Sequence, residues 1–277
     1  MTVAGSVLAL RAVTVRFGGV HALESVALDV RPAEVHGLVG PNGSGKTTIL
    51  NAICGFVGAE GEITLAGERI DGLAVHARMA LGLARTFQNP RPVRELTVRD
   101  LMRIGEHQRG TQPWWQVALM PWAADRAQRA TNERAAQLLA TLGLPAALLD
   151  ERLVNLPSGV LKMVDIARAL MGTPRVLLLD EPTSGMNEAE IALLHAALAE
   201  LRTGAMTIVL VEHNLRFMFD ICDAMTVLDT GRVIGAGTPD EVFRREDVIR
   251  AYLGAADAPT VTRRQAPVEL GSAPPSA

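Results

Sequence analysis

Hydrophobic residues along the chain form two kinds of pattern, which predict two kinds of strand. Mixed apolar and polar positions, typical of strands with one solvated face, occupy residues 7–17, 24–30 and 61–66. Short runs that are almost wholly apolar, typical of parallel strands covered on both faces, occupy residues 35–40, 175–180 and 207–212. We therefore expect an antiparallel sheet near the N-terminus and a mainly parallel core sheet.

Apolar residues recur at helical spacing in the long stretch between the first two apolar runs, most clearly in segment 125–144. This pattern predicts a helical subdomain, from about residue 89 to residue 170, inserted between the core strands. The fold class that follows is α/β, with a mainly parallel core sheet, an antiparallel β subdomain and an inserted helical subdomain.

A further helix is predicted directly after Asn187. Its apolar face carries Ile191, Leu194, Leu198 and Leu201. Asn187 is a good N-cap residue, and Glu190, three positions later, completes the pattern of a capping box. We expect this helix to pack on the core sheet.

The length of 277 residues fits one large α/β domain with an inserted lobe, which we place at residues 5–254. Residues 255–277 carry four prolines and little periodicity, so we expect a disordered tail there. The net charge of −3 gives no basic surface for nucleic acid, which we do not expect as a partner.

Cysteine and histidine usage points away from a disulfide framework and from a structural metal. Cys54 and Cys222 lie in apolar surroundings and are expected to be buried free thiols, and the six histidines are scattered. No run approaches the roughly 18 to 20 apolar residues that span a bilayer, and no secretory signal is visible. We therefore expect a cytoplasmic chain that could serve a membrane only from its inner face.

A phosphate-binding loop is predicted at residues 40–48, because Gly40-Pro-Asn-Gly-Ser-Gly-Lys-Thr47 fits G-x-x-x-x-G-K-[ST] between an apolar strand and a helix. In such a loop backbone N–H groups face phosphate oxygens, the lysine reaches the outer phosphates, and the Thr47 hydroxyl can bind Mg²⁺. The alternative is an ordinary glycine-rich turn. The candidate ATP-binding residues are Gly40, Pro41, Asn42, Gly43, Ser44, Gly45, Lys46, Thr47 and Thr48.

Two acidic residues end the apolar run at 175–180, namely Asp180 and Glu181. A phosphate loop needs a carboxylate for its metal ion and a group that positions water. We expect Asp180 to hold Mg²⁺ and Glu181 to orient or deprotonate the attacking water. A strand that merely ends in two solvated acids is the alternative.

These motifs, from about Val7 to Gly254, resemble the nucleotide-binding subunit of an ABC transporter, which has a P-loop NTPase fold. The resemblance implies that Phe17 stacks on adenine, that Gln88 lies near Mg²⁺ and water, and that His213 contacts the γ-phosphate. It makes residues 184–187 the D-loop. Taken singly, Phe17 could be a strand aromatic, Gln88 a surface amide and His213 a capping residue.

The signature motif of that family, ideally Leu-Ser-Gly-Gly-Gln, stands here as Leu156-Pro-Ser-Gly-Val. Pro157 replaces the serine and offers neither a hydroxyl nor an N–H group. Ser158, Gly159 and the N-terminus of the following helix could still present backbone donors to a phosphate. The alternative is a purely structural helix cap.

The resemblance also implies partners, because two such domains clasp two ATP molecules between the loop of one and the signature of the other. The altered signature, with Asn187 in place of the usual D-loop aspartate, favours a second ATPase chain that is not identical to this one. Stretches 16–20, 82–89, 211–214 and 248–254 are similar to importers of branched-chain amino acids and related amides. Such importers add two transmembrane permease subunits and an extracytoplasmic solute-binding protein.

Three other functions remain open at this point: a soluble ABC ATPase acting on ribosomes or DNA, a nonhydrolytic regulatory subunit, and an exporter ATPase. The first class generally has two nucleotide domains or a long coiled coil, neither of which this sequence contains. A cluster of tryptophans at 114, 115 and 122 is expected to pack the helical lobe, with docking on a membrane or permease as the alternative.

Overall fold

The computed structural model describes residues 5–86, 94–106 and 121–253. The predicted Gln88, the tryptophans at 114 and 115, and the tail at 255–277 lie outside the described residues, and the side chain of Trp122 is not described.

The N-terminal part of the chain forms a four-stranded antiparallel sheet in the order β2-β1-β4-β5. Its strands are β1 (Leu8–Phe17), β2 (Val20–Val30), β4 (Glu60–Leu65) and β5 (Glu68–Arg69). Buried positions alternate with exposed ones along much of β2, which leaves one face solvated. The expected antiparallel subdomain is confirmed.

A second sheet of six strands forms the core, in the order β10-β9-β3-β8-β7-β6. All its neighbouring strands are parallel except β10, which runs antiparallel to β9. The strands are β3 (Val35–Val39), β6 (Leu83–Arg85), β7 (Val176–Asp180), β8 (Thr207–Val211), β9 (Ala224–Asp229) and β10 (Arg232–Gly237). The three apolar runs become β3, β7 and β8, so their carboxyl ends meet at one edge.

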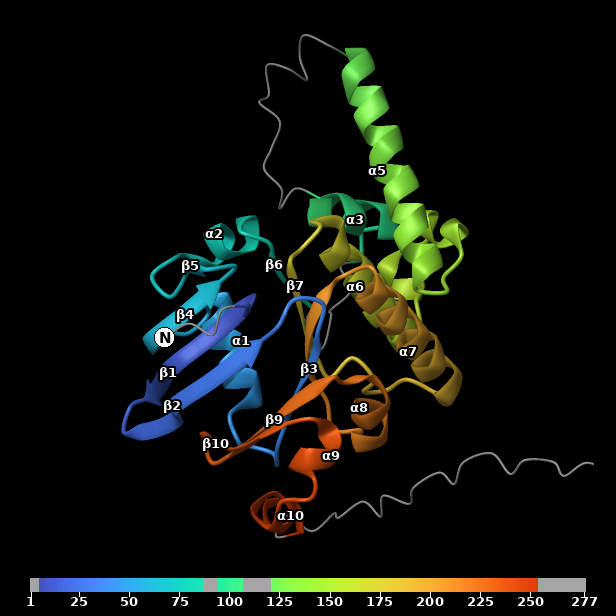
Figure 1. Cartoon of the computed structure of the whole chain (residues 1–277). Coiled ribbons are helices and arrows are strands. Elements are labelled where there is room, and N and C mark those ends of the chain that lie inside the picture. The colour runs from blue at the N-terminus through green and yellow to red at the C-terminus, as the bar shows by residue number, and fades with distance from the viewer. Residues whose placement is uncertain (1–4, 87–93, 107–120, 254–277) are drawn as a thin grey trace, which may run out of the picture.

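The apolar runs are unbroken because hydrophobic material covers both faces of this sheet. Successive residues of β7 point to opposite faces: Leu177 and Leu179 join one core cluster, while Val176 and Leu178 join the other. Helix α1 (Lys46–Cys54) packs in the cluster that contains Val176 and Leu178, between the two sheets (Figure 1). The fold class is therefore the expected one.

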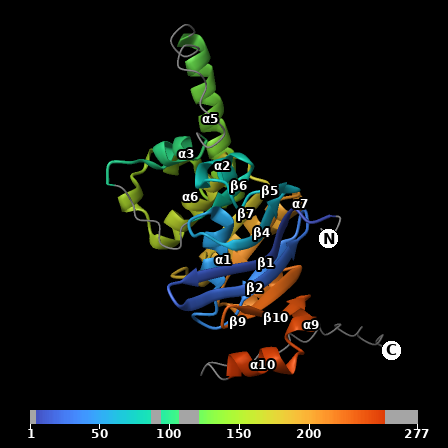
Figure 2. The same ribbon diagram turned by 90° about the vertical axis from the view of Figure 1, so that its left-hand side faces the viewer.

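Helices form the inserted lobe and cover the other face of the core sheet. Helix α5 (Pro121–Thr141) extends away from the sheets in both ribbon views, beside α3 (Val98–Glu106) and α6 (Ser158–Met171) (Figures 1 and 2). Two short 3₁₀ helices, 146–150 and 153–155, connect α5 to α6. The other described helices are α2 (Val75–Ala80), α7 (Glu188–Thr203), α8 (Leu215–Ile221), α9 (Pro239–Val242) and α10 (Glu246–Leu253).

Helix α7 begins as its sequence predicts. The Asn187 side chain accepts a hydrogen bond from the Glu190 backbone N–H at 3.0 Å, and the Glu190 carboxylate accepts one from the Asn187 N–H at 2.9 Å. Leu194 and Leu198 are fully buried in the core. The capping box and the buried face are thus confirmed.

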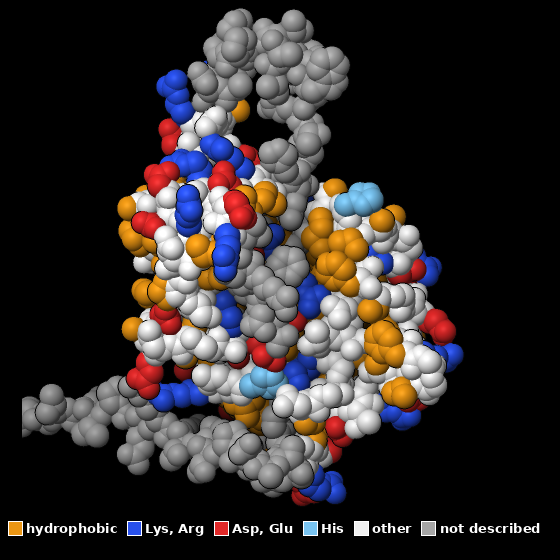
Figure 3. All heavy atoms as spheres, turned by 180° about the vertical axis from the view of Figure 1, so that it is seen from behind, with side chains coloured by type: hydrophobic (Ala, Val, Ile, Leu, Met, Phe, Trp, Pro, Cys, Tyr) orange, Lys and Arg blue, Asp and Glu red, His pale blue; other side chains and the backbone are white. Residues whose placement is uncertain are grey.

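Charges of both signs are interspersed over the surface shown in Figure 3, including the side of the helical lobe seen there. Within the described ranges, no helix combines the length and the apolar character that crossing a membrane requires.

Candidate functional site

The loop at 40–48 connects β3 to α1, and its backbone shape depends on glycine at two positions. Gly40 has φ of +149°, and a Cβ there would lie 2.1 Å from the Leu228 carbonyl oxygen. Gly45 has φ of +107°, and a Cβ there would lie 2.9 Å from the Ala22 carbonyl oxygen. Both positions therefore exclude a side chain, which explains their place in the motif.

Lys46 is the first residue of α1, and its side chain folds back over the loop. Its Nζ donates hydrogen bonds to the carbonyl oxygens of Gly40 at 2.8 Å and Pro41 at 2.9 Å. Burial lowers the pKa of the Lys46 ammonium, and the charges of Glu181 and Asp180 partly oppose that shift. Lys46 is thus a buried cation that lines the cavity beside the loop, near the carboxylates of Glu181 and Asp180.

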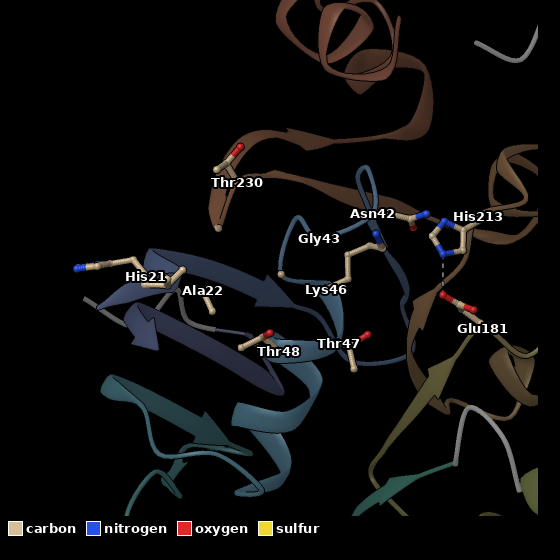
Figure 4. Close-up of a pocket in the computed structure, with 13 residues that line it drawn as sticks. His21, Ala22, Asn42, Gly43, Lys46, Thr47, Thr48, Glu181, His213 and Thr230 are labelled. Atoms are coloured by element: carbon tan, nitrogen blue, oxygen red, sulfur yellow. Dashed lines mark hydrogen bonds and ion pairs between the residues drawn. The ribbon is translucent and has the colours of Figure 1, made fainter. Parts of the chain in front are cut away.

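A cavity of about 380 Å³ lies against this loop. In Figure 4, His21 and Ala22 lie on one side of Lys46 and Thr47, and Glu181 and His213 lie on the other. The cavity is lined by Val20, His21, Ala22, Asn42, Gly43, Gly45, Lys46, Thr47, Thr48, Glu181, His213, Thr230 and Gly231. The fold therefore brings most of the predicted loop residues together with the second acid and the histidine.

Asp180 ends β7 and is almost completely buried. Its Oδ2 accepts a hydrogen bond from Arg85 Nη2 at 2.9 Å, an ion pair within the protein. Its Oδ1 is also buried and has no hydrogen-bond partner among the described residues. A buried carboxylate oxygen without a partner is costly unless a ligand or a water satisfies it.

Glu181 follows Asp180 with φ of +49°, a left-handed conformation that is uncommon for a residue with a side chain. Its N–H donates to the Val211 carbonyl at the end of β8 at 2.9 Å. Its Oε1 lies 2.6 Å from His213 Nε2, and both side chains face the cavity (Figure 4). The strained turn thus aims the carboxylate at the predicted histidine.

Two residues that the sequence analysis assigned no role hold this turn in place. Lys162, on α6, donates to the carbonyl oxygens of Glu181 at 3.0 Å and Ser184 at 2.6 Å. Buried Glu212 accepts from the backbone N–H groups of Thr183 at 2.6 Å and His213 at 3.1 Å. Glu212 had a recognisable signal, since it directly follows the apolar strand β8, as Glu181 directly follows β7.

Other predicted residues lie away from the cavity. Phe17 ends β1 and is 53% exposed; it is paired in the sheet with Val20, which does line the cavity. Ser158 and Gly159 begin α6 and do not line it. In the described part of the chain, no three histidine, cysteine or acidic side chains cluster as a ready-made metal site.

Comparison with known families places these features in context. A family model described as "ABC transporter" matches residues 23–184, and one described as "Branched-chain amino acid ATP-binding cassette transporter" matches residues 232–258. A solved structure of the ADP conformation of an ATP-binding cassette from an ABC transporter superposes with a TM-score of 0.77 at 29% identity. The alignment covers 90% of this chain and 99% of that chain.

Two curated relatives carry more specific names. The chain is 38% identical over 251 residues to the high-affinity branched-chain amino acid transport ATP-binding protein LivG of Salmonella typhimurium, covering 90% of this chain and 98% of that protein. It is 35% identical over 252 residues to the corresponding protein BraF of Pseudomonas aeruginosa, with the same coverage. The resemblance predicted from the motifs is confirmed, and the chain belongs to the ABC transporter family as an ATP-binding subunit.

Proposed function

We propose that this chain hydrolyses ATP to power a membrane importer of branched-chain amino acids or related small polar solutes. The observation that carries the proposal is one cavity that joins the phosphate loop with Lys46 to the Glu181–His213 pair. The names of LivG and BraF support the class of solute.

ATP binding would use the loop at 40–48. Its backbone N–H groups and the N-terminus of α1 would face the phosphates, and Lys46, which now donates to two loop carbonyl oxygens, would donate to phosphate oxygens instead. Phe17, exposed at the end of β1, is available to stack on adenine.

The donor atoms present fit Mg²⁺, which prefers oxygen ligands and keeps several from water and phosphate. Asp180 Oδ1, buried without a partner, and the Thr47 hydroxyl would hold the ion, with Gln88 as a third ligand from outside the described residues. When bound, Mg²⁺ neutralises charge on the phosphate oxygens.

Hydrolysis needs an ordered water molecule, and we assign the positioning of this water to Glu181. Its carboxylate would orient the water or take a proton from it at Oε1 or Oε2. In this structure His213 Nε2 is hydrogen-bonded to Glu181 Oε1. When ATP binds, the same nitrogen would contact the γ-phosphate. Lys162 and Glu212 hold in place the backbone turns that carry Glu181 and His213.

A second ATPase chain is required for a composite site, and we propose that it is not identical to this one. Pro157, the N-cap of α6, makes no side-chain cap hydrogen bond and has no hydroxyl for phosphate. The Glu190 carboxylate lies against Gly159, where a Cβ would come within 2.5 Å of both of its oxygens. A negative charge beside this helix N-terminus opposes phosphate binding, which weakens the signature that this chain lends to its partner.

The remaining partners follow from the importer type. We propose two transmembrane permease subunits, with the chain held peripherally on the inner face of the cell membrane, and an extracytoplasmic solute-binding protein that acts indirectly. No role in nucleic-acid binding is proposed.

The test is to purify the chain with its native membrane partners, reconstitute them in lipid, and measure ATP hydrolysis with and without candidate solutes. Leucine, isoleucine or valine with the solute-binding protein should stimulate hydrolysis, and Lys46→Ala in this chain should abolish the stimulation. Copurification without any permease, or hydrolysis that no such solute changes, would overturn the proposal.

A further inference from the structure

Arg85 ends β6 and has a side chain that is only 11% exposed, yet the phosphate site as assigned above gives it no role. Its guanidinium reaches two elements at once. Nη2 donates to Asp180 Oδ2 on β7 at 2.9 Å, and Nη1 donates to Asn51 Oδ1 on α1 at 2.6 Å. The Phe56 ring also lies 5.8 Å from the guanidinium carbon.

Asn51 ties this contact to the phosphate loop. It is four residues after Thr47 on α1, and residues at that spacing share one face of a helix, one turn apart. Arg85 therefore bridges the helix that carries Thr47 and the strand that carries Asp180. The planar fork of an arginine can satisfy two acceptors in a fixed relative position, which a lysine ammonium cannot match.

The contact with Arg85 gives the two oxygens of the Asp180 carboxylate different environments. Oδ2 is held by Arg85, while Oδ1 is buried and has no hydrogen-bond partner in the part of the chain that the structure describes. A carboxylate fixed through one oxygen keeps the other in a defined direction. Mg²⁺ demands ligands in near-ideal octahedral positions, so the direction of that oxygen matters.

The backbone of Arg85 is itself anchored from α6. Its carbonyl oxygen accepts a hydrogen bond from Arg168 Nη2 at 2.9 Å, and Arg168 Nε donates to Asp165 Oδ1 at 2.6 Å. Both of these α6 side chains are buried. Arg85 is thus fixed at its main chain as well as at its guanidinium.

We propose that Arg85 is a positioning residue for the Mg²⁺ site, which sets the spacing between the Thr47 hydroxyl and Asp180 Oδ1 so that both can bind one ion. This inference rests on the proposed function, because it takes ATP and Mg²⁺ as the ligands. Arg85 does not touch the ion, and it acts only through Asp180 and Asn51.

Its test is a binding experiment on the purified full-length chain with a fluorescent ATP analogue such as TNP-ATP. The Mg²⁺ concentration that half-saturates the Mg²⁺-dependent part of binding is measured, together with analogue affinity in EDTA. Arg85→Met should raise the half-saturating Mg²⁺ concentration by about 10- to 100-fold, the usual range for groups that orient metal ligands. Analogue affinity in EDTA should change by less than about threefold, because the phosphate loop itself is unchanged.

Three further variants sharpen the result. Asn51→Ala removes one arm of the bridge and should shift the Mg²⁺ requirement in the same direction but less, which keeps the test available if Arg85→Met does not fold. Arg85→Lys should rescue only part of the loss. Arg69→Met removes the exposed arginine of an ion pair between Arg69 on β5 and Asp71, and should leave the Mg²⁺ requirement at its wild-type value.

An unchanged Mg²⁺ requirement in folded Arg85→Met and Asn51→Ala would overturn the inference. Equal weakening with Mg²⁺ and with EDTA would also overturn it, since Arg85 would then merely support the fold. Failure of the wild-type chain to bind the analogue under either condition would instead overturn the proposed function.

Discussion

At the scale of single residues, Glu181 has an uncommon backbone conformation, with φ of +49°. A residue with a side chain held at a positive φ costs on the order of 1–3 kcal/mol, so the surrounding contacts must maintain it. Contacts within the described residues include the Val211 carbonyl oxygen, which accepts a hydrogen bond from the Glu181 N–H, and Lys162 Nζ and the Ser184 N–H, which donate to the Glu181 carbonyl oxygen. The conformation that aims the carboxylate at His213 is thus built from distant parts of the chain.

Lys162→Met should therefore lower the free energy of unfolding by about 1–3 kcal/mol, because the Glu181 and Ser184 carbonyls lose their ammonium donor. Urea denaturation of the purified chain measures this change. Lys162→Arg, which keeps a cationic donor, should lose less, and Arg129→Met on the exposed face of α5 should lose almost nothing. A wild-type urea midpoint for Lys162→Met would contradict the role given to these contacts.

Residues within contiguous motifs could be predicted, whereas residues that act from other segments could not. The loop at 40–48 and the Asp180–Glu181 pair are recognisable because neighbouring residues supply the chemistry. Arg85 reaches Asp180 across 95 positions of sequence, and Lys162 reaches Glu181 across 19. Such contacts depend on how strands and helices pack, which single-sequence patterns do not specify.

At the scale of elements, helix starts and fully covered strands follow most directly from local physical chemistry. Strands β3, β7 and β8 are buried along their whole length and stand out as apolar runs. Strand β6 has three residues, and the edge strand β10 contains Gly235 and Gly237, so neither shows a periodic signal of its own. The sequence accordingly predicted the centre of the core sheet better than its edges.

Asn187, the N-cap of α7, stands where the D-loop of this family usually has aspartate, so its capping role can be tested by substitution. Asn187→Ala should lower the free energy of unfolding by about 1 kcal/mol through loss of the N-cap, measured by urea denaturation. Asn187→Asp should leave it nearly unchanged, since aspartate caps helices about as well as asparagine. An equal loss in both variants would show that the amide nitrogen of Asn187, rather than capping, stabilises this turn.

At the scale of the whole molecule, the two sheets and the helical lobe divide the ATPase into parts with different tasks. The carboxyl ends of β3, β7 and β8 bring Lys46, Asp180 and His213 to one edge, as expected where parallel strands end. The N-termini of α6 and α7 pack together, with Glu190 against Gly159. This contact is consistent with our proposal that the chain contributes a strong phosphate loop and a weak signature to an assembled pair of ATPases.

The domain limits at 5–254 and the disordered tail at 255–277 stay predictions. The identity of the solute also stays a prediction, because a transported molecule would contact the permeases and the solute-binding protein rather than this chain.

The role of Glu181 in hydrolysis is tested most directly in the assembled transporter, with Glu181→Gln in this chain and a photoreactive ATP labelled at its γ-phosphate. Crosslinking after one turnover isolates the nucleotide held by this chain from the one held by its partner. We predict that the variant retains the γ-label while the wild-type chain loses it, with similar initial binding in both. Loss of the γ-label from Glu181→Gln at the wild-type rate would contradict the assignment of Glu181, and with it the proposed mechanism of hydrolysis.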